Sequence, residues 1–75
     1  MKMEKKMIRE PVSSSNIASI GYDESSLTLE IEFIRSGVYE YSDIPPHVYN
    51  ELLNAPSIGI YFNANIKNKY PTTKN

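Results

Sequence analysis

Apolar and polar side chains alternate along the first half of the chain, and this pattern predicts a sheet. From Leu27 to Ile34, apolar residues alternate with threonine and glutamate, so one face of this strand should be apolar and the other acidic. Ile17 to Tyr22 and Val38 to Asp43 are two further strand-like runs, and turn residues separate all three. The pattern predicts a three-stranded antiparallel meander that is covered on one face.

In the second half of the chain the apolar spacing becomes helical. Proline suits the first turn of a helix, so a helix should begin near Pro46, with an apolar stripe made of Val48, Tyr49, Leu52 and Leu53. Ser57 is predicted to cap a second helix. That helix ends before Pro71, and its apolar face comprises Ile58, Tyr61, Phe62, Ile66 and Tyr70. Strands followed by helices predict an α+β fold, with both short helices packed on the apolar face of the meander.

Length and composition fit one small domain. The chain has 75 residues and no cysteine, so it is too short for several domains and has no disulfide framework. We expect residues 1–11 to be a disordered or frayed tail, residues 12–70 to form the domain, and residues 71–75 to be a polar tail. No apolar run approaches the roughly 18 residues of a membrane span, and no signal-peptide pattern is present. A cytoplasmic protein without a membrane partner is therefore expected.

The charged residues are distributed unevenly along the chain. Residues 1–10 have four basic and two acidic side chains, and residues 67–75 have three lysines and no acid. Residues 11–66 have one arginine and seven acids. Nucleic-acid-binding faces are typically basic, and an acidic body is a poor match for one. Any phosphate contact would therefore depend on the two ends, although charged ends also serve simply to keep a small protein in solution.

A set of residues in fixed order resembles a known family. Along the chain these are Ser14, Ile17, Ile20-Gly21-Tyr22-Asp23, the strand from Leu29 to Phe33, Gly37, Tyr39-Glu40-Tyr41, Ile44-Pro45, Val48-Tyr49, Leu52, Ala55, Ser57, Gly59, Tyr61-Phe62-Asn63, Ile66 and Tyr70. Over residues 12–70 the chain resembles the KTSC domain, which is named for its place at the C-terminus of some lysyl-tRNA synthetases and also occurs as single-domain bacterial proteins. The resemblance implies a small non-catalytic binding module, and the synthetase context suggests RNA as its ligand.

The position of Tyr39 and Tyr41 depends on the register of the hairpin before them. A two-residue loop would place both rings on the acidic face, where they could stack on unpaired bases. A three-residue loop, Arg35 to Gly37, would pair Phe33 with Tyr39 and put both tyrosines in the core or at its edge. We expect the three-residue loop, because Gly37 suits its left-handed third position and the apolar groups then share one face. The outer face would then carry Thr28, Glu30, Glu32 and Glu40.

The candidate binding residues lie at and after the start of the second helix. A helix N-terminus attracts anions; Ser57 could add a hydroxyl there, and Gly59 would let a ligand approach the backbone. Alternatively, Ser57 is only a cap and Gly59 only allows two helices, or a helix and the sheet, to pack closely. Asparagine is unfavourable inside a helix, and Asn63 is a better candidate than Asn65 for a specific hydrogen bond because it matches the family pattern. Basic and aromatic groups for RNA would come from Lys67, Lys69 and Tyr70.

The residues that catalysis would need do not occur in suitable patterns. His47 is the only histidine and cysteine is absent, so the usual zinc sites cannot be built. The serine run Ser13 to Ser15 lacks the spacing of an activated nucleophile, and no glycine-rich phosphate loop is present. We therefore predict no enzyme activity, no catalytic residue, no metal site and no cofactor.

Protein–protein interaction is the second class of function that the sequence supports. An edge strand of the sheet, or an exposed apolar patch such as Ile34 to Val38, could hold a partner, and the chain would be a monomer or a weak homodimer. Salt would separate the two classes, because phosphate-dominated binding weakens steeply with salt and binding through an apolar patch hardly responds.

Overall fold

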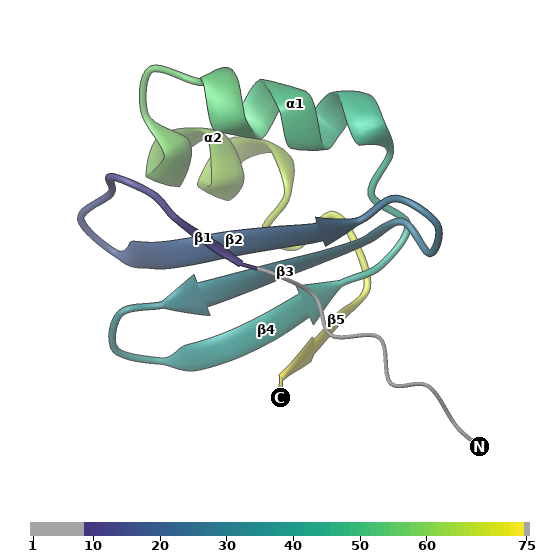
Figure 1. Ribbon diagram of the computed structural model, residues 1–75, viewed down its shortest axis with the longest axis horizontal. Helices are drawn as coiled ribbons and strands as arrows, with labels where there is room; N and C mark the ends of the chain where they lie inside the picture. The colour runs from purple at the N-terminus through teal and green to yellow at the C-terminus, as the bar shows by residue number, and fades with distance from the viewer. Residues whose placement is uncertain (1–8, 75) are drawn as a thin grey trace.

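Among the described residues, five antiparallel strands form one sheet, and two helices cover a single face of it (Figure 1). These features come from a computed structural model, which describes residues 9–74. The strands lie in chain order and are β1 (Glu10–Pro11), β2 (Ile17–Asp23), β3 (Thr28–Phe33), β4 (Gly37–Tyr41) and β5 (Thr72–Lys74). Helices α1 (Pro46–Asn54) and α2 (Ile58–Asn65) lie between β4 and β5 in the chain. The predicted α+β fold, a strand meander followed by two helices, is confirmed.

The sheet has two more strands than the three predicted, and both come from segments that were expected to be tails. β5 pairs with β4, with Thr72 opposite Tyr41, and all three of its residues are exposed. A strand this short and polar has no apolar alternation by which the sequence could predict it. β1 pairs with β2 through Glu10 and Pro11, and Pro11 suits an edge position because it has no N–H to donate. The rest of the expected N-terminal tail, residues 1–8, lies outside the described residues.

The β3–β4 hairpin keeps the predicted faces but not the predicted pairing. Ile31, and not Phe33, lies opposite Tyr39, so the predicted register is wrong by two residues. Because side chains alternate with a period of two, this shift leaves every side chain on its predicted face. The loop comprises residues 34–36, and Gly37, with a φ of 91°, supplies the left-handed conformation that was predicted for it.

The ends of the predicted elements shift where the chain turns. Leu27 lies in the turn before β3 with a φ of 56°, and Ile34 lies in the turn after it. α1 begins at Pro46 as predicted. α2 ends at Asn65, five residues before Tyr70, because the chain turns after Ile66. The apolar spacing continues beyond the end of the helix, so the predicted length of the second helix is wrong.

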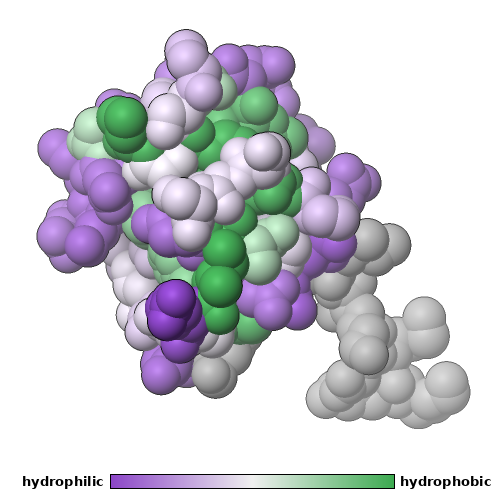
Figure 2. Space-filling view, turned by 90° about the vertical axis from the view of Figure 1, so that its left-hand side faces the viewer, coloured by the Kyte–Doolittle hydropathy of each residue, from purple (hydrophilic) through white to green (hydrophobic). Residues whose placement is uncertain are grey.

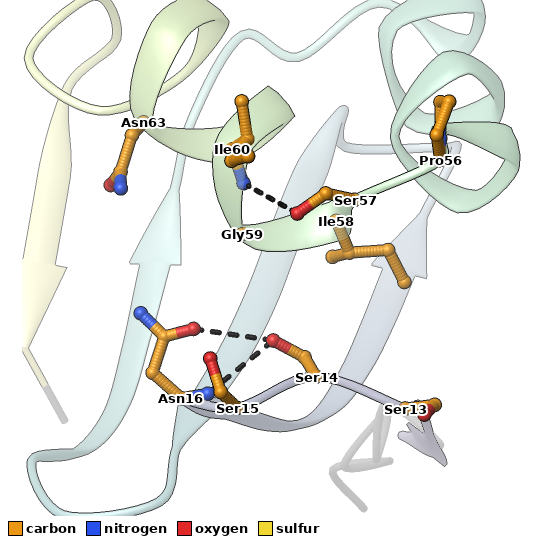
Figure 3. Close-up of a pocket in the computed structure, with 10 residues that line it drawn as sticks. All are labelled: Ser13, Ser14, Ser15, Asn16, Pro56, Ser57, Ile58, Gly59, Ile60 and Asn63. Atoms are coloured by element: carbon orange, nitrogen blue, oxygen red, sulfur yellow. Dashed lines mark hydrogen bonds between the residues drawn. The ribbon is translucent and has the colours of Figure 1, made fainter.

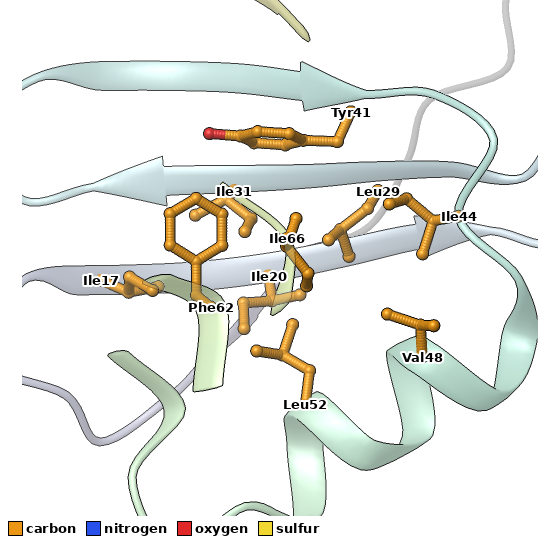
Figure 4. Close-up of a cluster of buried hydrophobic side chains, with 10 residues drawn as sticks. All are labelled: Ile17, Ile20, Leu29, Ile31, Tyr41, Ile44, Val48, Leu52, Phe62 and Ile66. Atoms are coloured by element: carbon orange, nitrogen blue, oxygen red, sulfur yellow. The ribbon is translucent and has the colours of Figure 1, made fainter. Parts of the chain in front are cut away.

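The core lies between the sheet and the helices and contains side chains from three strands, both helices and the segments that follow β4 and α2 (Figure 4). A β-bulge between Ile17 and Ser19 allows Ile17 and Ile20 to face this core together, although they are three residues apart. Among the described residues, the buried apolar side chains are Ile17, Ile20, Leu29, Ile31, Tyr41, Ile44, Val48, Leu52, Phe62 and Ile66. The helices therefore pack against the inner face of the sheet and leave its outer face uncovered.

The outer face of the sheet carries the predicted glutamates, and two of them, Glu30 and Glu32, accept hydrogen bonds from neighbouring side chains. Arg9 reaches across it and donates hydrogen bonds to Glu30 Oε1 at 2.7 Å and to Ser19 Oγ at 3.2 Å. Ser19 in turn donates to Glu32 at 2.8 Å. Glu30 is only 8% exposed, so a basic residue from the N-terminal segment neutralises part of this face. In residues 9–74, no helix is long and apolar enough to cross a membrane.

Candidate functional site

A groove opens at the end of the molecule where α2 faces the start of β2 and the β3–β4 loop. Its volume is about 330 Å³, and its lining contains Asn16, Phe33, Ser36, Tyr39, Tyr41, Phe62, Asn63 and Lys67. We call it the Asn16 groove. A second hollow of about 550 Å³ adjoins it, between residues 13–16 and the start of α2, and the two share Asn16 and Asn63. Figure 2 views this end of the molecule, where apolar side chains lie among weakly polar ones.

The Asn16 side chain is held in one orientation by Ser14. Ser14 Oγ accepts hydrogen bonds from the backbone N–H groups of Asn16 at 3.4 Å and Ile17 at 3.3 Å. Its own hydrogen is donated to Asn16 Oδ1, at 3.2 Å. Since the amide oxygen is engaged in this way, the Nδ2 group points away from Ser14, to the side where Asn63 lies (Figure 3). Asn16 therefore offers two N–H donors to a ligand.

Gly59 allows the Asn16 amide to lie against the first turn of α2. A Cβ atom at position 59 would lie 3.1 Å from Asn16 Oδ1 and 3.7 Å from Ser14 Oγ, and the first of these distances is too short for an ordinary contact. The glycine therefore serves close packing, which was one of the two predicted interpretations. The group that packs against it is the loop before β2 and not another helix or the sheet.

Ser57 caps α2 as predicted. Its Oγ accepts a hydrogen bond from the backbone N–H of Ile60 at 3.3 Å (Figure 3), and its backbone has the extended conformation of an N-cap. The hydroxyl is therefore already engaged with the helix, and the cap itself accounts for a serine at this position.

Asn63, like Asn50 of α1, has no hydrogen bond from its side chain within the described residues, whereas two other helical asparagines each have one. Asn54 donates to Asn50 O at 2.8 Å and Asn65 donates to Tyr61 O at 3.2 Å, each to the carbonyl one turn earlier. The sequence predicted that Asn63, rather than Asn65, would make the specific bond, and the structure gives that bond to Asn65. The Asn63 amide instead projects into the space above Asn16 (Figure 3).

Four aromatic rings form the floor of the groove. The Phe33 ring packs edge-on against Tyr39 at 5.5 Å and against Phe62 at 5.4 Å, and Tyr41 packs edge-on against Phe62 at 5.3 Å. Tyr41 is 5% exposed, and its hydroxyl points away from Leu29 and Ile44 (Figure 4). Burial raises the pKa of Tyr41, with a smaller contribution from Tyr39, so this hydroxyl stays neutral at physiological pH. The floor is therefore made of aromatic rings packed edge-on against one another and carries no charge.

Basic side chains surround this aromatic floor. Lys67 lines the groove, and Lys74 Nζ lies 5.8 Å from the centre of the Tyr39 ring. Arg35 lines a smaller adjoining hollow of about 230 Å³ that also contains Asn16. Among the described residues that line these three hollows, none is acidic. This end of the molecule therefore differs in charge from the acidic outer face of the sheet.

The structure brings together only part of the predicted binding set. Ser57, Gly59 and Asn63 line one hollow, and Asn63 and Lys67 line the next. Lys67 and Lys69 follow α2 in a turn rather than lying on it, and neither Lys69 nor Tyr70 lines the Asn16 groove. Tyr70 packs against the core. In the described part of the chain, no group of three potential metal-ligating side chains occurs.

Sequence reasoning missed Asn16 and underrated Ser14. Ser14 belongs to the residues that carry the family resemblance, which was a usable signal. Asn16 lies 43 residues before Gly59, its neighbour across the hollow, and no local pattern connects the two positions.

The fold and the groove define a class of small α+β domains with a helix-covered antiparallel meander, and comparisons with known proteins place the chain within it. The KTSC domain family matches residues 13–70, so the chain belongs to the KTSC domain family. A crystal structure of a KTSC domain protein from Yersinia pestis has a TM-score of 0.91 and 41% identity, covering 93% of this chain and 99% of that one.

Relatives occur both as small proteins and within larger ones. An uncharacterized protein of Stutzerimonas stutzeri is 42% identical over 57 residues, which cover 76% of this chain and 80% of the relative. A lysine–tRNA ligase of Nostoc punctiforme is 46% identical over 56 residues, or 75% of this chain but only 10% of the ligase.

Proposed function

We propose that this chain is a non-catalytic binding module that holds single-stranded RNA in the Asn16 groove. The observation that carries the proposal is the combination, in one hollow, of an aromatic floor, two amides and Lys67, with Lys74 beside the Tyr39 ring. Unpaired bases bind to aromatic surfaces and to polar groups that meet their edges, and lysine or arginine contacts the phosphates.

The distribution of charge favours this end of the molecule over the sheet face. Glu30, Glu32 and Glu40 lie on the outer face, opposite to the helices, and Glu51 lies on α1, where it accepts a hydrogen bond from Tyr61 at 2.7 Å. The basic residues Lys67, Lys74 and Arg35 lie around the groove instead. A phosphate backbone would thus meet positive charge at the groove and negative charge elsewhere, which selects both the site and the direction of approach.

The relatives give independent support for an RNA ligand. A segment 46% identical to this chain occurs in a protein named as a lysine–tRNA ligase, and this name says that the ligase acts on a tRNA. A cytoplasmic location, without a membrane partner, accompanies the proposal. Nothing in the groove requires a cofactor, a metal or a catalytic group for this function.

Fluorescence anisotropy with a labelled single-stranded RNA of mixed sequence tests the proposal. Binding should weaken as salt rises, with a slope of about −0.7 in log affinity per log salt for each phosphate contact. Lys67→Glu should weaken binding and flatten that slope, whereas the matched variant Lys69→Glu, two residues away and outside the groove, should bind nearly as the parent protein does. Absence of salt-sensitive binding at micromolar protein, or equal losses in the two variants, would overturn the proposal.

Protein–protein interaction remains a second candidate, because the described surface carries an apolar patch on α2. Ile60 is 70% exposed and lies with Pro56 and Ala64 around a shallow hollow of about 320 Å³. The outer edge of β5 is also open among the described strands. Association through either surface should be insensitive to salt and should fall on Ile60→Lys, which analytical ultracentrifugation over a concentration series would detect.

A further inference from the structure

The two amides that face the Asn16 groove can distinguish classes of base. We infer that the groove selects an unpaired pyrimidine over a purine and that Asn16 is the residue that makes the distinction. This inference rests on the RNA-binding function proposed above and adds the identity of the nucleotide that the groove prefers.

Asn63 supplies the first part of the recognition surface. Its amide carries one acceptor and one pair of donors, and within the described residues neither is engaged. Asn54 and Asn65 each make a local hydrogen bond to the carbonyl one turn earlier, whereas the exposed amide of Asn63, like that of Asn50, makes none within the described residues. A free amide of this kind pairs with an adjacent donor and acceptor on a base edge. All four bases offer such a pair, so Asn63 alone binds a base without identifying it.

Asn16 supplies a third hydrogen-bonding group, next to the donor and the acceptor of Asn63. Ser14 engages its oxygen, so only its N–H donors face the groove. After the donor–acceptor pair on the Watson–Crick edge, the next group of uracil and cytosine is the O2 carbonyl, which accepts a hydrogen bond. At the same place adenine has a C–H and guanine has an amino group. A donor from Asn16 is therefore satisfied by a pyrimidine, left unpaired by adenine and opposed by guanine.

The surroundings hold the two amides in place for this task. Gly59 leaves room for the Asn16 amide, and the Ser14 hydroxyl donates a hydrogen bond to its oxygen that favours the orientation with Nδ2 turned away from Ser14. The groove volume of about 330 Å³ lies at the lower end of the range of about 300–1,000 Å³ for small-molecule sites, which fits one nucleotide. Lys67, on the rim, is placed to contact a flanking phosphate.

The test compares labelled oligouridylate, oligocytidylate and oligoadenylate of about eight nucleotides at one salt concentration. For the parent protein we expect both pyrimidine oligomers to bind about tenfold more tightly than oligoadenylate, the discrimination of one well-placed base contact. Asn16→Ala should bring the affinities close together, and Asn16→Asp, which replaces the donor by an acceptor, should do the same or reverse the order. Asn65→Ala, a matched asparagine of α2 outside the groove, should keep the pyrimidine preference.

Folding of each variant is checked by its amide spectrum in solution. Equal, salt-sensitive binding of all three oligomers by the parent protein would overturn the base selection and leave RNA binding intact. A pyrimidine preference that survives in Asn16→Ala would overturn the role of Asn16. Failure of all three oligomers to bind would overturn the proposed function and this inference together.

Discussion

Replacing Gly59 by alanine separates the stability of the fold from the function of the groove. The new Cβ atom would lie 3.1 Å from Asn16 Oδ1, and ordinary contacts begin at 3.4 Å, so the amide oxygen must move by a few tenths of an ångström. The Ser14–Asn16 hydrogen bond is already 3.2 Å long, and this movement would weaken or break it. Asn16 would then no longer be held with its donors towards the groove.

Two contributions to the free energy of unfolding nearly cancel in this variant. Alanine is more favourable than glycine in a helix by about 1 kcal/mol. Loss of the hydrogen bond between Ser14 and Asn16 costs about 0.5–1.5 kcal/mol. We therefore expect urea denaturation to give a stability within about 1 kcal/mol of the parent protein. The affinity for oligouridylate should nevertheless fall by about tenfold, which corresponds to one lost contact of about 1.4 kcal/mol.

A double-mutant cycle with Asn16→Ala makes the reasoning refutable. If Gly59→Ala acts by displacing the Asn16 amide, it should have little further effect once that amide has been removed. Parent-like RNA affinity in Gly59→Ala, or an equal loss with and without the Asn16 side chain, would show that the glycine does not act through Asn16.

Three further predictions concern the fold. Leu52→Ala should destabilise the protein by about 2–5 kcal/mol in urea denaturation, because Leu52 is fully buried. The adjacent Leu53→Ala should cost less than about 1 kcal/mol, because Leu53 is 40% exposed. Equal losses of stability in the two variants would contradict the predicted core. Gly37→Ala should cost about 1–2 kcal/mol because the φ of 91° strains any residue with a Cβ, and an unchanged midpoint would contradict this. The hydrogen bond to Glu51 raises the pKa of Tyr61 to about 12. The contribution of this hydrogen bond to stability should therefore be complete below pH 10 and lost as the pH rises to 12. Glu51→Gln should lower the pKa of Tyr61 in an ultraviolet titration, and an unshifted titration would refute the assignment.

The sequence predicts those parts of the fold that depend on side-chain periodicity. The apolar face of β3 and the start of α1 follow directly from spacing and from proline chemistry. The register of the β3–β4 hairpin escapes this reasoning, because a shift of two residues leaves every side chain on the same face. β1 and β5 escape it as well, since two or three polar residues gain their strand geometry only from the neighbour with which they pair.

The end of α2 shows a second limit of prediction from side-chain spacing. Ile66 and Tyr70 continue the apolar spacing of the helix, but Asn68 has a left-handed φ of 66°, and the chain has already turned. Burial on one face does not require that the backbone remain helical, so periodicity could not locate this boundary.

The candidate site was predictable only for residues in α2 or next to its ends. Ser57 and Gly59 could be selected from local chemistry, and Lys67 from its charge. The role of Asn16 depends on a contact between the loop before β2 and the first turn of α2, which requires the folded chain. The predicted glutamates do lie on the outer face, but the ion pair between Arg9 and Glu30 could not be predicted for a similar reason, because Arg9 comes from a distant part of the sequence.

A two-dimensional ¹H–¹⁵N NMR titration of the parent protein with unlabelled oligouridylate shows directly whether RNA occupies the Asn16 groove. We predict progressive shifts of the backbone amides of residues 13–16 and 57–63 and of Lys67, together with the side-chain amide signals of Asn16 and Asn63. Residues of α1 and of the outer sheet face should not move. Shifts centred on α1 or on the outer face, or no shifts at millimolar RNA, would contradict the account.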